Sequence, residues 1–414
     1  MSSSSRSRPA MRDRTLPLGR GLLLAAAAAL PGLPAAAAEV FYQPIVTLQA
    51  ETDTNLDLEP GIKQDVQGYI ADAATVIGIA TKDSDTILKP RVIYRYYPQD
   101  SADDRIEAHL DFNTDYRTQR SSANLAGSLQ HLDEFNAEET SAIYNDVNPG
   151  LPIPTDTGKI VNGATRDSGF LMPKYQYSIT PVFGVGASGQ YQVVNYSPSD
   201  LNHLDFNYYQ GRAFVSWTFS QTSDMQLGGF GSKFDSNKLG DRATGTGATF
   251  DFNTTWTPLF STKVSLLYQH TSIDDTTPPL QEGVNAWGGL VAAVYKNQVD
   301  QLRLTAGRTI SPSGAGALSN VNKVQLQYDR NLTARWSITG ALVGLRTTAL
   351  TSNVEGDDRK YTQALVESRW NMTRYWFIQG GYQYAWQRYQ FDVTSAANNR
   401  VYIQIGYQGL GQER

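Results

Sequence analysis

The stretch from Arg374 to Arg388 reads Arg-Tyr-Trp-Phe-Ile-Gln-Gly-Gly-Tyr-Gln-Tyr-Ala-Trp-Gln-Arg. From Trp376 to Trp386 every second residue is apolar, aromatic or glycine, and the positions between them from Gln379 onward hold Gln, Gly and Ala. Successive side chains of a β-strand point to opposite faces, so this alternation predicts a strand with one apolar face and one polar face. A tilted transmembrane strand needs about 9–11 residues, and the stretch is long enough to supply them.

The same alternation returns along the chain from Phe41 onward and predicts eighteen strands. Single-chain bacterial barrels have an even number of strands, and sixteen remains the alternative if the first pair is misread. A soluble sandwich or propeller rarely has so many long strands in succession. We therefore predict an all-β, transmembrane, antiparallel up-and-down β-barrel. The predicted strands are 42–53, 69–82, 85–97, 104–117, 121–132, 169–180, 182–196, 205–221, 223–235, 243–257, 260–273, 284–296, 299–310, 320–330, 334–347, 359–372, 374–389 and 399–409.

Aromatic residues gather near the ends of these strands, where two interfacial girdles are expected. A soluble sheet has no need of a Tyr or Trp at so many strand ends, so the pattern favours the membrane barrel. The residues are Tyr42, Tyr96, Tyr196, Tyr209, Trp217, Trp256, Trp287, Trp336, Trp370, Trp376 and Trp386.

The connections between predicted strands alternate in length. Short turns such as Thr180-Pro181 and Pro258-Leu259 are expected on the periplasmic side, and longer gaps on the outside. The longer gaps are 197–204, 236–242, 274–283, 311–319, 348–358 and 390–398, and the largest, 134–168, is rich in Asp, Asn, Pro and Gly. Such a long loop is usually functional or disordered, and it either folds inward as a constriction or stands outside.

The first 38 residues have the pattern of a cleaved signal peptide. Five arginines precede the apolar run Gly21–Leu33, and Ala36-Ala37-Ala38 offers a cleavage site before Glu39. The apolar run is too short to span about 30 Å of hydrocarbon as a helix. We therefore assign residues 1–38 to a signal peptide and 39–414 to the barrel domain.

Composition excludes several function classes. The chain has no cysteine, which excludes disulfides, iron–sulfur centres and thiol nucleophiles. Residues 39–414 hold 30 basic and 39 acidic side chains, a net charge of −9 that argues against nucleic acid as a partner. No two histidines fall at metal-ligand spacing with a carboxylate, and no cofactor motif is present, so we expect neither a metal nor a cofactor.

Catalytic patterns are equally sparse, and we expect no enzymatic activity. A barrel lipase would pair a serine with a histidine on the lipid face. His270 lies on the apolar face of its predicted strand beside Leu266 and Tyr268, but no Gly-x-Ser-x-Gly elbow accompanies it. An interfacial histidine is therefore the more economical interpretation.

One short repeat is visible along the chain. His109-Leu-Asp-Phe-Asn113 recurs as His203-Leu-Asp-Phe-Asn207, and Phe250-Asp-Phe-Asn253 repeats its second half. A metal or sugar-binding signature is one interpretation. Hairpin duplication, with the same alternation used again at similar strand positions, is the simpler one.

The polar face of each strand is expected to line a wet interior, because a charge facing lipid costs about 2–4 kcal/mol at the midplane. Both signs occur on these faces, so strong ion selectivity is not expected. The candidate lumen-lining residues are Lys89, Arg91, Arg95, Arg105, Glu107, Asp111, Arg212, Asp251, Lys263, Arg303, Lys323 and Glu367.

Three segments carry a resemblance to a known family: the start of the barrel from Tyr42 to Leu56, the segment Thr305–Gly316, and the end from Asn398 to Gly409. Together they resemble the outer-membrane β-barrel proteins associated with exopolysaccharide biosynthesis and PEP-CTERM-type loci. The resemblance implies the outer membrane of a Gram-negative bacterium, with lipid and lipopolysaccharide around the barrel, and a secreted polysaccharide and periplasmic export proteins as partners. The chain departs from many such barrels by running past Tyr407 to Arg414 instead of ending on an aromatic residue.

Two functional hypotheses follow. The first is a passive channel with a polar lumen, serving exopolysaccharide export or the passage of solutes, since the chain has no nucleotide site to supply motive force. The alternative is a non-conducting structural or assembly barrel plugged by the 134–168 loop.

Overall fold

The structure is a computed structural model. It describes residues 39–61, 65–99, 105–133, 165–197, 204–236, 242–276, 279–314, 318–350, 358–390, 393–410 and 412–413. The predicted signal peptide, residues 1–38, and residues 134–164 of the largest predicted loop lie outside these ranges.

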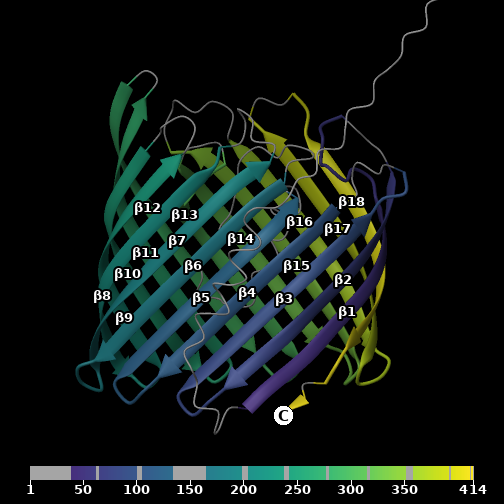
Figure 1. The fold of residues 1–414 in the computed structure, drawn as a ribbon, viewed down its shortest axis with the longest axis horizontal. Coiled ribbons are helices and arrows are strands. Elements are labelled where there is room, and N and C mark those ends of the chain that lie inside the picture. The colour runs from purple at the N-terminus through teal and green to yellow at the C-terminus, as the bar shows by residue number, and fades with distance from the viewer. Residues whose placement is uncertain are drawn as a thin grey trace, which may run out of the picture. The chain divides into compact units, whose positions relative to one another are not determined.

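Long antiparallel strands make up the described chain (Figure 1). No helix long and apolar enough to cross a membrane occurs in the described ranges. The strands are β1 (Glu39–Asp53), β2 (Val66–Ala80), β3 (Ser84–Tyr96), β4 (Arg105–Arg117), β5 (Ser121–Asp133), β6 (Thr165–Ser178), β7 (Phe183–Ser197), β8 (Phe206–Ser220), β9 (Ser223–Ser236), β10 (Arg242–Thr257), β11 (Phe260–Thr276), β12 (Pro279–Lys296), β13 (Asp300–Pro312), β14 (Leu318–Asn331), β15 (Trp336–Ala349), β16 (Arg359–Asn371), β17 (Trp376–Tyr389), β18 (Ala396–Gln408) and the short β19 (Gln412–Glu413).

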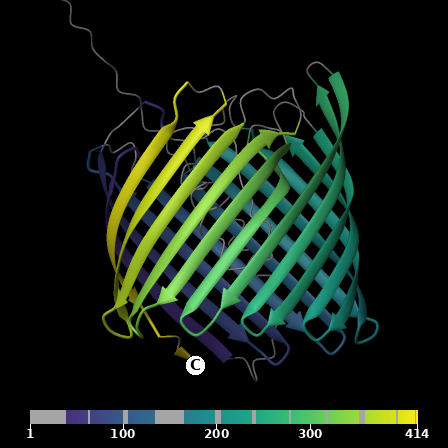
Figure 2. The same cartoon turned by 180° about the vertical axis from the view of Figure 1, so that it is seen from behind.

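Each strand pairs with its neighbours in sequence, and β1 pairs with both β2 and β18, which closes the sheet. Seen from opposite sides, the inclined strands form one continuous wall (Figures 1 and 2). Closure leaves no unpaired edge, which is the condition for a sheet to exist in lipid. The predicted barrel of eighteen long strands is confirmed, and the alternative of sixteen is wrong.

The chain end extends this closure beyond the last long strand. Gly409 donates its N–H to the carbonyl of Pro44 at 2.8 Å, and β19 then pairs with Phe41 and Tyr42 of β1. Gln408, Gly409, Gln412 and Glu413 therefore continue the pairing with β1 after Tyr407.

Short turns and long connections alternate as predicted, with one exception. Residues 274–283 are predicted as a loop, but β11 and β12 continue in register to the pair Thr276 and Pro279. The two strands rise as a hairpin above the barrel wall (Figure 1). The prediction was wrong because the polar sequence Asp274-Asp275-Thr276 lacks the apolar alternation that marks a strand in the wall.

An apolar belt covers the outside of the barrel. On each strand, exposed large apolar side chains occupy alternate positions, among them Leu48, Val92, Ile106, Leu227, Leu266, Val324, Leu342, Val366, Val401 and Ile403. At the short-turn end the belt is bordered by exposed tryptophans: Trp217, Trp256, Trp336, Trp370 and Trp376. One predicted girdle residue is misplaced, because Tyr196 is 4% exposed and packs with Phe206 and Phe234 inside the barrel.

The buried apolar side chains form separate clusters inside the barrel near the long-loop end. One cluster joins Val194, Tyr196 and Phe206 on β7 and β8 to Leu318 at the start of β14. Leu204, just before β8, donates its N–H to the carbonyl of Gly314 at 2.7 Å, so the β7–β8 and β13–β14 connections meet. These two connections thus reach inward over the barrel interior.

Candidate functional site

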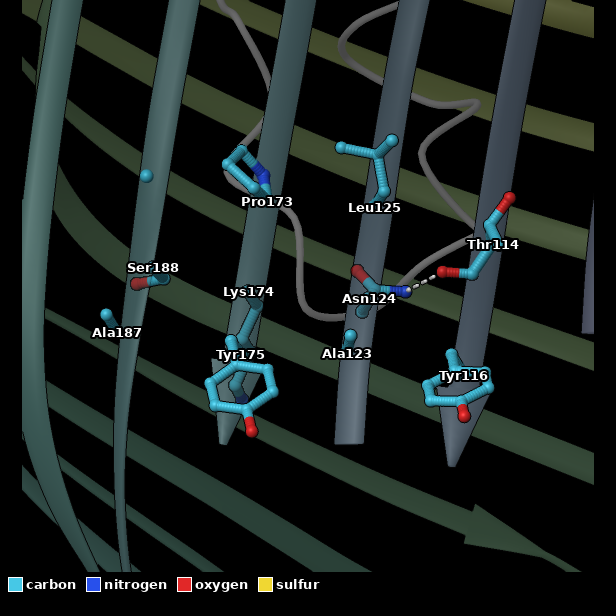
Figure 3. A pocket seen from close by; sticks show the side chains of 11 residues that line it. Thr114, Tyr116, Ala123, Asn124, Leu125, Pro173, Lys174, Tyr175, Ala187 and Ser188 are labelled. Carbon is cyan, nitrogen blue, oxygen red and sulfur yellow. Dashed lines mark hydrogen bonds between the residues drawn. The ribbon is translucent and has the colours of Figure 1, made fainter. Parts of the chain in front are cut away.

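A hollow of about 450 Å³ lies between strands β4 to β7. Tyr116, Leu125 and Tyr175 line it, and all three belong to the exposed apolar belt. Small residues such as Ala123 and Ala187 leave the space between the larger rings (Figure 3). Because these side chains face outward, the hollow belongs to the lipid-facing surface, and the predicted lumen-lining charges lie on the opposite face.

The twelve predicted lumen residues all occupy the inner face. Their positions alternate with the exposed belt, as Arg91 and Arg95 alternate with Val92 and Tyr94 on β3. On β4, Glu107 follows the exposed Ile106 and therefore faces inward. The same alternation places the remaining predicted residues inward too, namely Lys89, Arg105, Asp111, Arg212, Asp251, Lys263, Arg303, Lys323 and Glu367.

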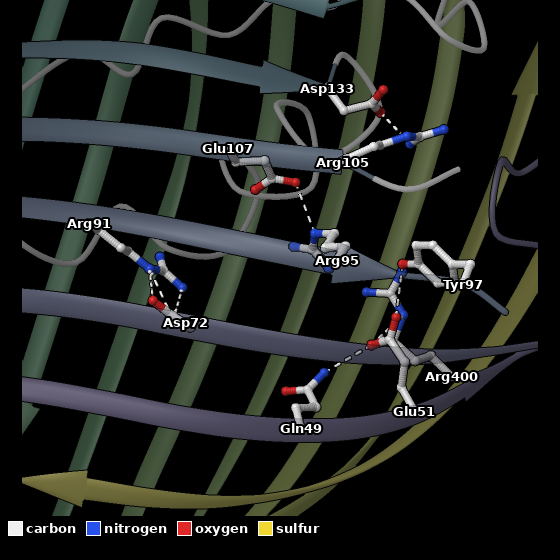
Figure 4. Close-up of polar contacts among 10 residues, drawn as sticks. All are labelled: Gln49, Glu51, Asp72, Arg91, Arg95, Tyr97, Arg105, Glu107, Asp133 and Arg400. Carbon is white, nitrogen blue, oxygen red and sulfur yellow. Dashed lines mark hydrogen bonds and ion pairs between the residues drawn. The ribbon is translucent and has the colours of Figure 1, made fainter. Parts of the chain in front are cut away.

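A charge network closes the seam between β1 and β18 at the long-loop end (Figure 4). Arg400 lies with its Nε 3.0 Å from Asp53 Oδ2 and 3.8 Å from Glu51 Oε2. Tyr97 Oη donates to Glu51 Oε1 at 3.1 Å, and Gln49 Nε2 donates to Glu51 Oε2 at 2.9 Å. The side chains of the two acids are 0% exposed and that of Arg400 is 7% exposed, so water does not reach this network.

Tyr97 follows directly after β3 and is part of the same network. Burial and the neighbouring Glu51 carboxylate raise the pKa of Tyr97 above that of an ordinary tyrosine. The phenol therefore remains a hydrogen-bond donor, which is the form that a buried carboxylate requires.

A second set of buried ion pairs lies on β3 to β5 at the same level (Figure 4). Arg95 Nε is 2.8 Å from Glu107 Oε1, and Arg105 Nη1 is 2.7 Å from Asp133 Oδ1. Arg105 also lies 3.8 Å from Asp57 in the connection between β1 and β2. Buried charges of this kind need their partners, since the loss of one leaves the other desolvated.

The connection between β1 and β2 folds inward and covers these charges. Leu56 packs with Val66 and Tyr97, and Leu58 packs against inner side chains of β15 to β18, including Val343 and Leu365. The carbonyl of Leu58 accepts a hydrogen bond from Gln387 Nε2 at 2.8 Å. Leu58 has a φ of 49°, which is uncommon for a branched residue and shows that packing holds this turn in place.

A different set of inward ion pairs lies nearer the short turns and is partly exposed. Arg91 binds Asp72 through Nη2 at 2.7 Å, with side chains 36% and 19% exposed. Arg212 and Asp251 are 2.6 Å apart with side chains 18% and 17% exposed. Arg303 and Asp329 are 3.1 Å apart with side chains 27% and 30% exposed. Because these groups face into a closed barrel, their exposed surface indicates a hydrated interior.

Polar neighbours hold these exposed pairs in place. Ser265 Oγ donates to Asp251 Oδ1 at 2.6 Å, and Thr339 Oγ1 donates to Asp329 Oδ1 at 2.8 Å. Phe214 lies beside Arg212, whose guanidinium carbon is 5.1 Å from the ring centroid. The pairs are therefore fixed groups on the wall, able to contact a passing polar solute without rearrangement.

The remaining predicted residues are distributed around the wall and do not converge on one point. Lys89 lies opposite Asp111 in the register of β3 and β4, and Ser128 Oγ donates to Asp111 at 2.6 Å. Glu367 accepts a hydrogen bond from Tyr402. Lys263 and Lys323 occupy inward positions on β11 and β14.

Several inward residues were missed by the sequence prediction. They include Asp72, Asp329 and Arg400, each of which completes an ion pair. The alternation of faces along a strand is enough to place them. Asp72 lies three positions from the exposed Tyr69 and Arg400 lies next to the exposed Val401, so both point to the inner face. Their pairing could not be read from this alternation, since it depends on the register between strands.

His270 lies on the outer face, as its position on the apolar side predicts. Its Nδ1 is 2.8 Å from Asn285 Oδ1 on β12, an arrangement that orients the ring. The other ring nitrogen lies beside Gly283 of the same strand. No serine of the described residues bonds His270, so the ring has an orienting partner but no nucleophile.

The repeated His-Leu-Asp-Phe-Asn sequence does not form one kind of site. In the first copy Phe112 lies on the outer face, whereas in the second Phe206 is buried inside the barrel. His203 lies outside the described residues. Within the described ranges no group of three or more acids and histidines is arranged to hold a metal ion.

Closure, length and outer surface together define the class of protein. A closed antiparallel barrel of long strands, apolar outside and polar inside, is the β-architecture that spans a membrane. The chain is an outer-membrane-type β-barrel.

No protein-family model matches the sequence, and no curated protein matches it. Among solved structures it is similar to Pseudomonas aeruginosa OccK2 (OpdF) in complex with glucuronate, at 11% identity and a TM-score of 0.46, covering 90% of this chain and 98% of that one. It is also similar to Acinetobacter baumannii OccAB1, at 10% identity and a TM-score of 0.44, covering 89% and 96%. P. aeruginosa OpdK with vanillate gives 10% identity and 0.44, covering 90% and 99%.

These identities and TM-scores are too low to support an argument. The assignment of the barrel rests on the strand register of this chain itself. The matches give no support to the association with exopolysaccharide loci that the sequence resemblance implies.

Proposed function

We propose that the barrel is a passive channel for small polar solutes across the outer membrane. The observation that carries this proposal is the set of inward, partly exposed ion pairs on β2–β3, β8–β10 and β13–β14. A dry interior would leave such charges with a desolvation penalty of several kcal/mol each, so they indicate water inside the wall.

The narrowest part of the path is proposed to lie in the extracellular half, where the β1–β2 connection folds inward. Leu58 reaches the inner faces of β15 to β18, and Leu56 packs beside Tyr97. This connection is anchored by the hydrogen bond that the carbonyl of Leu58 accepts from Gln387. A fixed constriction of this kind selects solutes by size, while the charge pairs below it, being of both signs, give weak ion selectivity.

The test is single-channel conductance of the refolded 39–414 chain in a planar bilayer, followed by swelling of proteoliposomes in solutes of graded size. A stable conductance with passage of monosaccharide-sized solutes is the expected result. No conductance in the bilayer together with no swelling would contradict the channel and favour the hypothesis of a structural barrel.

The same bilayer measurement distinguishes export of a secreted polysaccharide from the general passage of solutes. Fragments of the host's exopolysaccharide that block the open pore at low concentration, when unrelated glycans of equal length do not, would favour export over general passage.

The plug proposed for residues 134–168 is tested by shortening that loop, since a plugged barrel conducts only after the change.

A further inference from the structure

A row of basic residues crosses the outer face of β13 to β17. Strand register aligns Arg308 with Asn322, Asn322 with Arg346, Arg346 with Lys360, and Lys360 with Arg388. All four basic side chains are exposed. Their even positions match those of the exposed belt residues on the same strands, so they point away from the lumen. We call Arg308, Arg346, Lys360 and Arg388 the basic row.

Two members of the basic row lie at a defined height. Arg346 and Lys360 are ten residues along their strands from Trp336 and Trp370, two exposed tryptophans that are register partners at the short-turn end. Ten residues at about 3.3 Å each, on strands tilted by about 40°, correspond to roughly 25 Å along the membrane normal. That is the height of the apolar band of an outer-membrane barrel, so Arg346 and Lys360 lie at the boundary of the outer leaflet. Because the strands are tilted, the row rises from β13 to β17, with Arg308 below these two residues and Arg388 above them.

Among the described residues, no acidic side chain neutralises the basic row. No carboxylate of the described residues forms an ion pair with any of its four members. Asp358, two residues before Lys360, is the nearest acid in sequence. Its carboxylate accepts a hydrogen bond from the Ala349 N–H at 3.3 Å. Arg346, Lys360 and Arg388 are register neighbours on adjacent strands, and their positive charges repel one another unless an anion lies among them.

The corresponding outer face of the barrel at β9 and β10 is arranged differently. Lys233 and Arg242 both face outward near the long-loop end, and Asp235 lies 3.3 Å from the first and 3.4 Å from the second. On that side each of the two cations therefore has a carboxylate partner within the protein, which the two share. The contrast shows that the uncompensated charge of β13 to β17 is local and not a general property of the rim.

We propose that the basic row binds the phosphate groups of lipopolysaccharide in the outer leaflet. Arginine offers paired N–H donors that match phosphate oxygens, and lysine adds a point charge. Adjacent strands lie about 4.8 Å apart, so the basic row spans roughly 19 Å, which accommodates more than one phosphate. The acyl chains of the same lipid would lie on the belt directly below, along Leu342, Val366 and Tyr382.

The experiment measures binding of purified bis-phosphorylated lipid A to the refolded 39–414 barrel in detergent, by native mass spectrometry across a concentration series. Dephosphorylated lipid A and phosphatidylglycerol are the comparison lipids. The variant R346Q/K360Q/R388Q is expected to lose at least about tenfold in affinity for bis-phosphorylated lipid A, because juxtamembrane basic residues contribute about 1 kcal/mol each toward an anionic surface.

The variant K233Q/R242Q is the matched control, since it removes two exposed basic residues of the same rim that both form ion pairs with Asp235. It should bind within about twofold of the unaltered barrel. Heat-modifiable electrophoretic mobility checks that each variant is folded, and R346K/R388K, which keeps the charge, should retain most of the affinity.

Three results would overturn the proposal. Unchanged affinity of the triple variant would show that the basic row does not bind the lipid. An equal loss in the control would show general rim electrostatics instead of a site. Equal binding of phosphatidylglycerol and bis-phosphorylated lipid A would assign the basic row to any anionic lipid and not to lipopolysaccharide.

Discussion

The inner wall carries two sets of ion pairs, made of the same residue types on the same face of the same sheet, in different surroundings. The network of Glu51, Asp53 and Arg400 is sealed beneath the β1–β2 connection, whereas the pairs Arg212–Asp251 and Arg303–Asp329 are partly exposed. The difference is that the β1–β2 connection covers the first set and not the second. The sealed set therefore fixes strands and the inward connection, and the exposed set is proposed to face the solute path.

The largest expected effect comes from breaking the sealed set. Arg400→Met leaves Asp53 and Glu51 buried without their cation, and should reduce the free energy of unfolding by about 3–5 kcal/mol. Urea titration of the refolded barrel in lipid vesicles measures this loss. Arg212→Met, which removes a comparable arginine from the exposed set, is the control, and an equal loss there would erase the distinction between the two sets.

Removing the cover is expected to have a smaller effect on stability and a larger one on conduction. Leu58→Ala removes a buried side chain from the contact with β15 to β18 and should cost about 2–3 kcal/mol. Loosening the connection should also widen the proposed constriction and raise single-channel conductance. Val343→Ala, at the wall side of the same contact, tests the assignment, since conductance should then change less than with Leu58→Ala.

Altering the exposed set should change selectivity with little cost in stability. Asp251→Asn leaves Arg212 without its acid and should make the channel more anion-selective, while Arg212→Gln should shift it toward cations. Each should change unfolding free energy by about 1 kcal/mol or less, as for other solvent-screened pairs. Reversal potentials in a salt gradient provide the measurement, and shifts in the same direction for both variants would argue against a conducting role for this pair.

The smallest expected effect is that of salt. Raising the ionic strength from 0.1 M to 1 M shortens the Debye length from about 10 Å to about 3 Å, which screens exposed charges and leaves buried ones nearly unaffected. The selectivity changes of the Asp251 and Arg212 variants should shrink at high salt. The stability loss of Arg400→Met should persist, and its disappearance at 1 M would show that water reaches the sealed set.

Much of the wall follows from local sequence pattern. Alternation from Trp376 to Gln387 places each of those side chains on its face without knowledge of any neighbour, and the same rule places Arg91, Glu107 and Arg303 inward. It succeeds because lipid outside and water inside make the two faces chemically opposite. It fails for residues 274–283, where β11 and β12 continue in register although the sequence lacks the apolar alternation.

The contacts within the barrel follow a different rule. Tyr196 resembles a girdle residue in sequence, yet it packs beside Phe206 because the long-loop end of β7 faces an interior apolar cluster. Nor does the sequence around Leu56 and Leu58 indicate that this connection folds inward. The alternation rule carries no information on connections, which have no regular pattern of faces.

Sequence alone determined the eighteen strands, their faces and the inner-face positions of the twelve predicted lumen residues, because a period of two is a local property of the chain. Tertiary structure decided which charges meet, which are sealed and which basic residues align in a row across β13 to β17. Those relations depend on strand register and on the path of the connections, and both are set by contacts between residues as distant in sequence as Asp53 and Arg400.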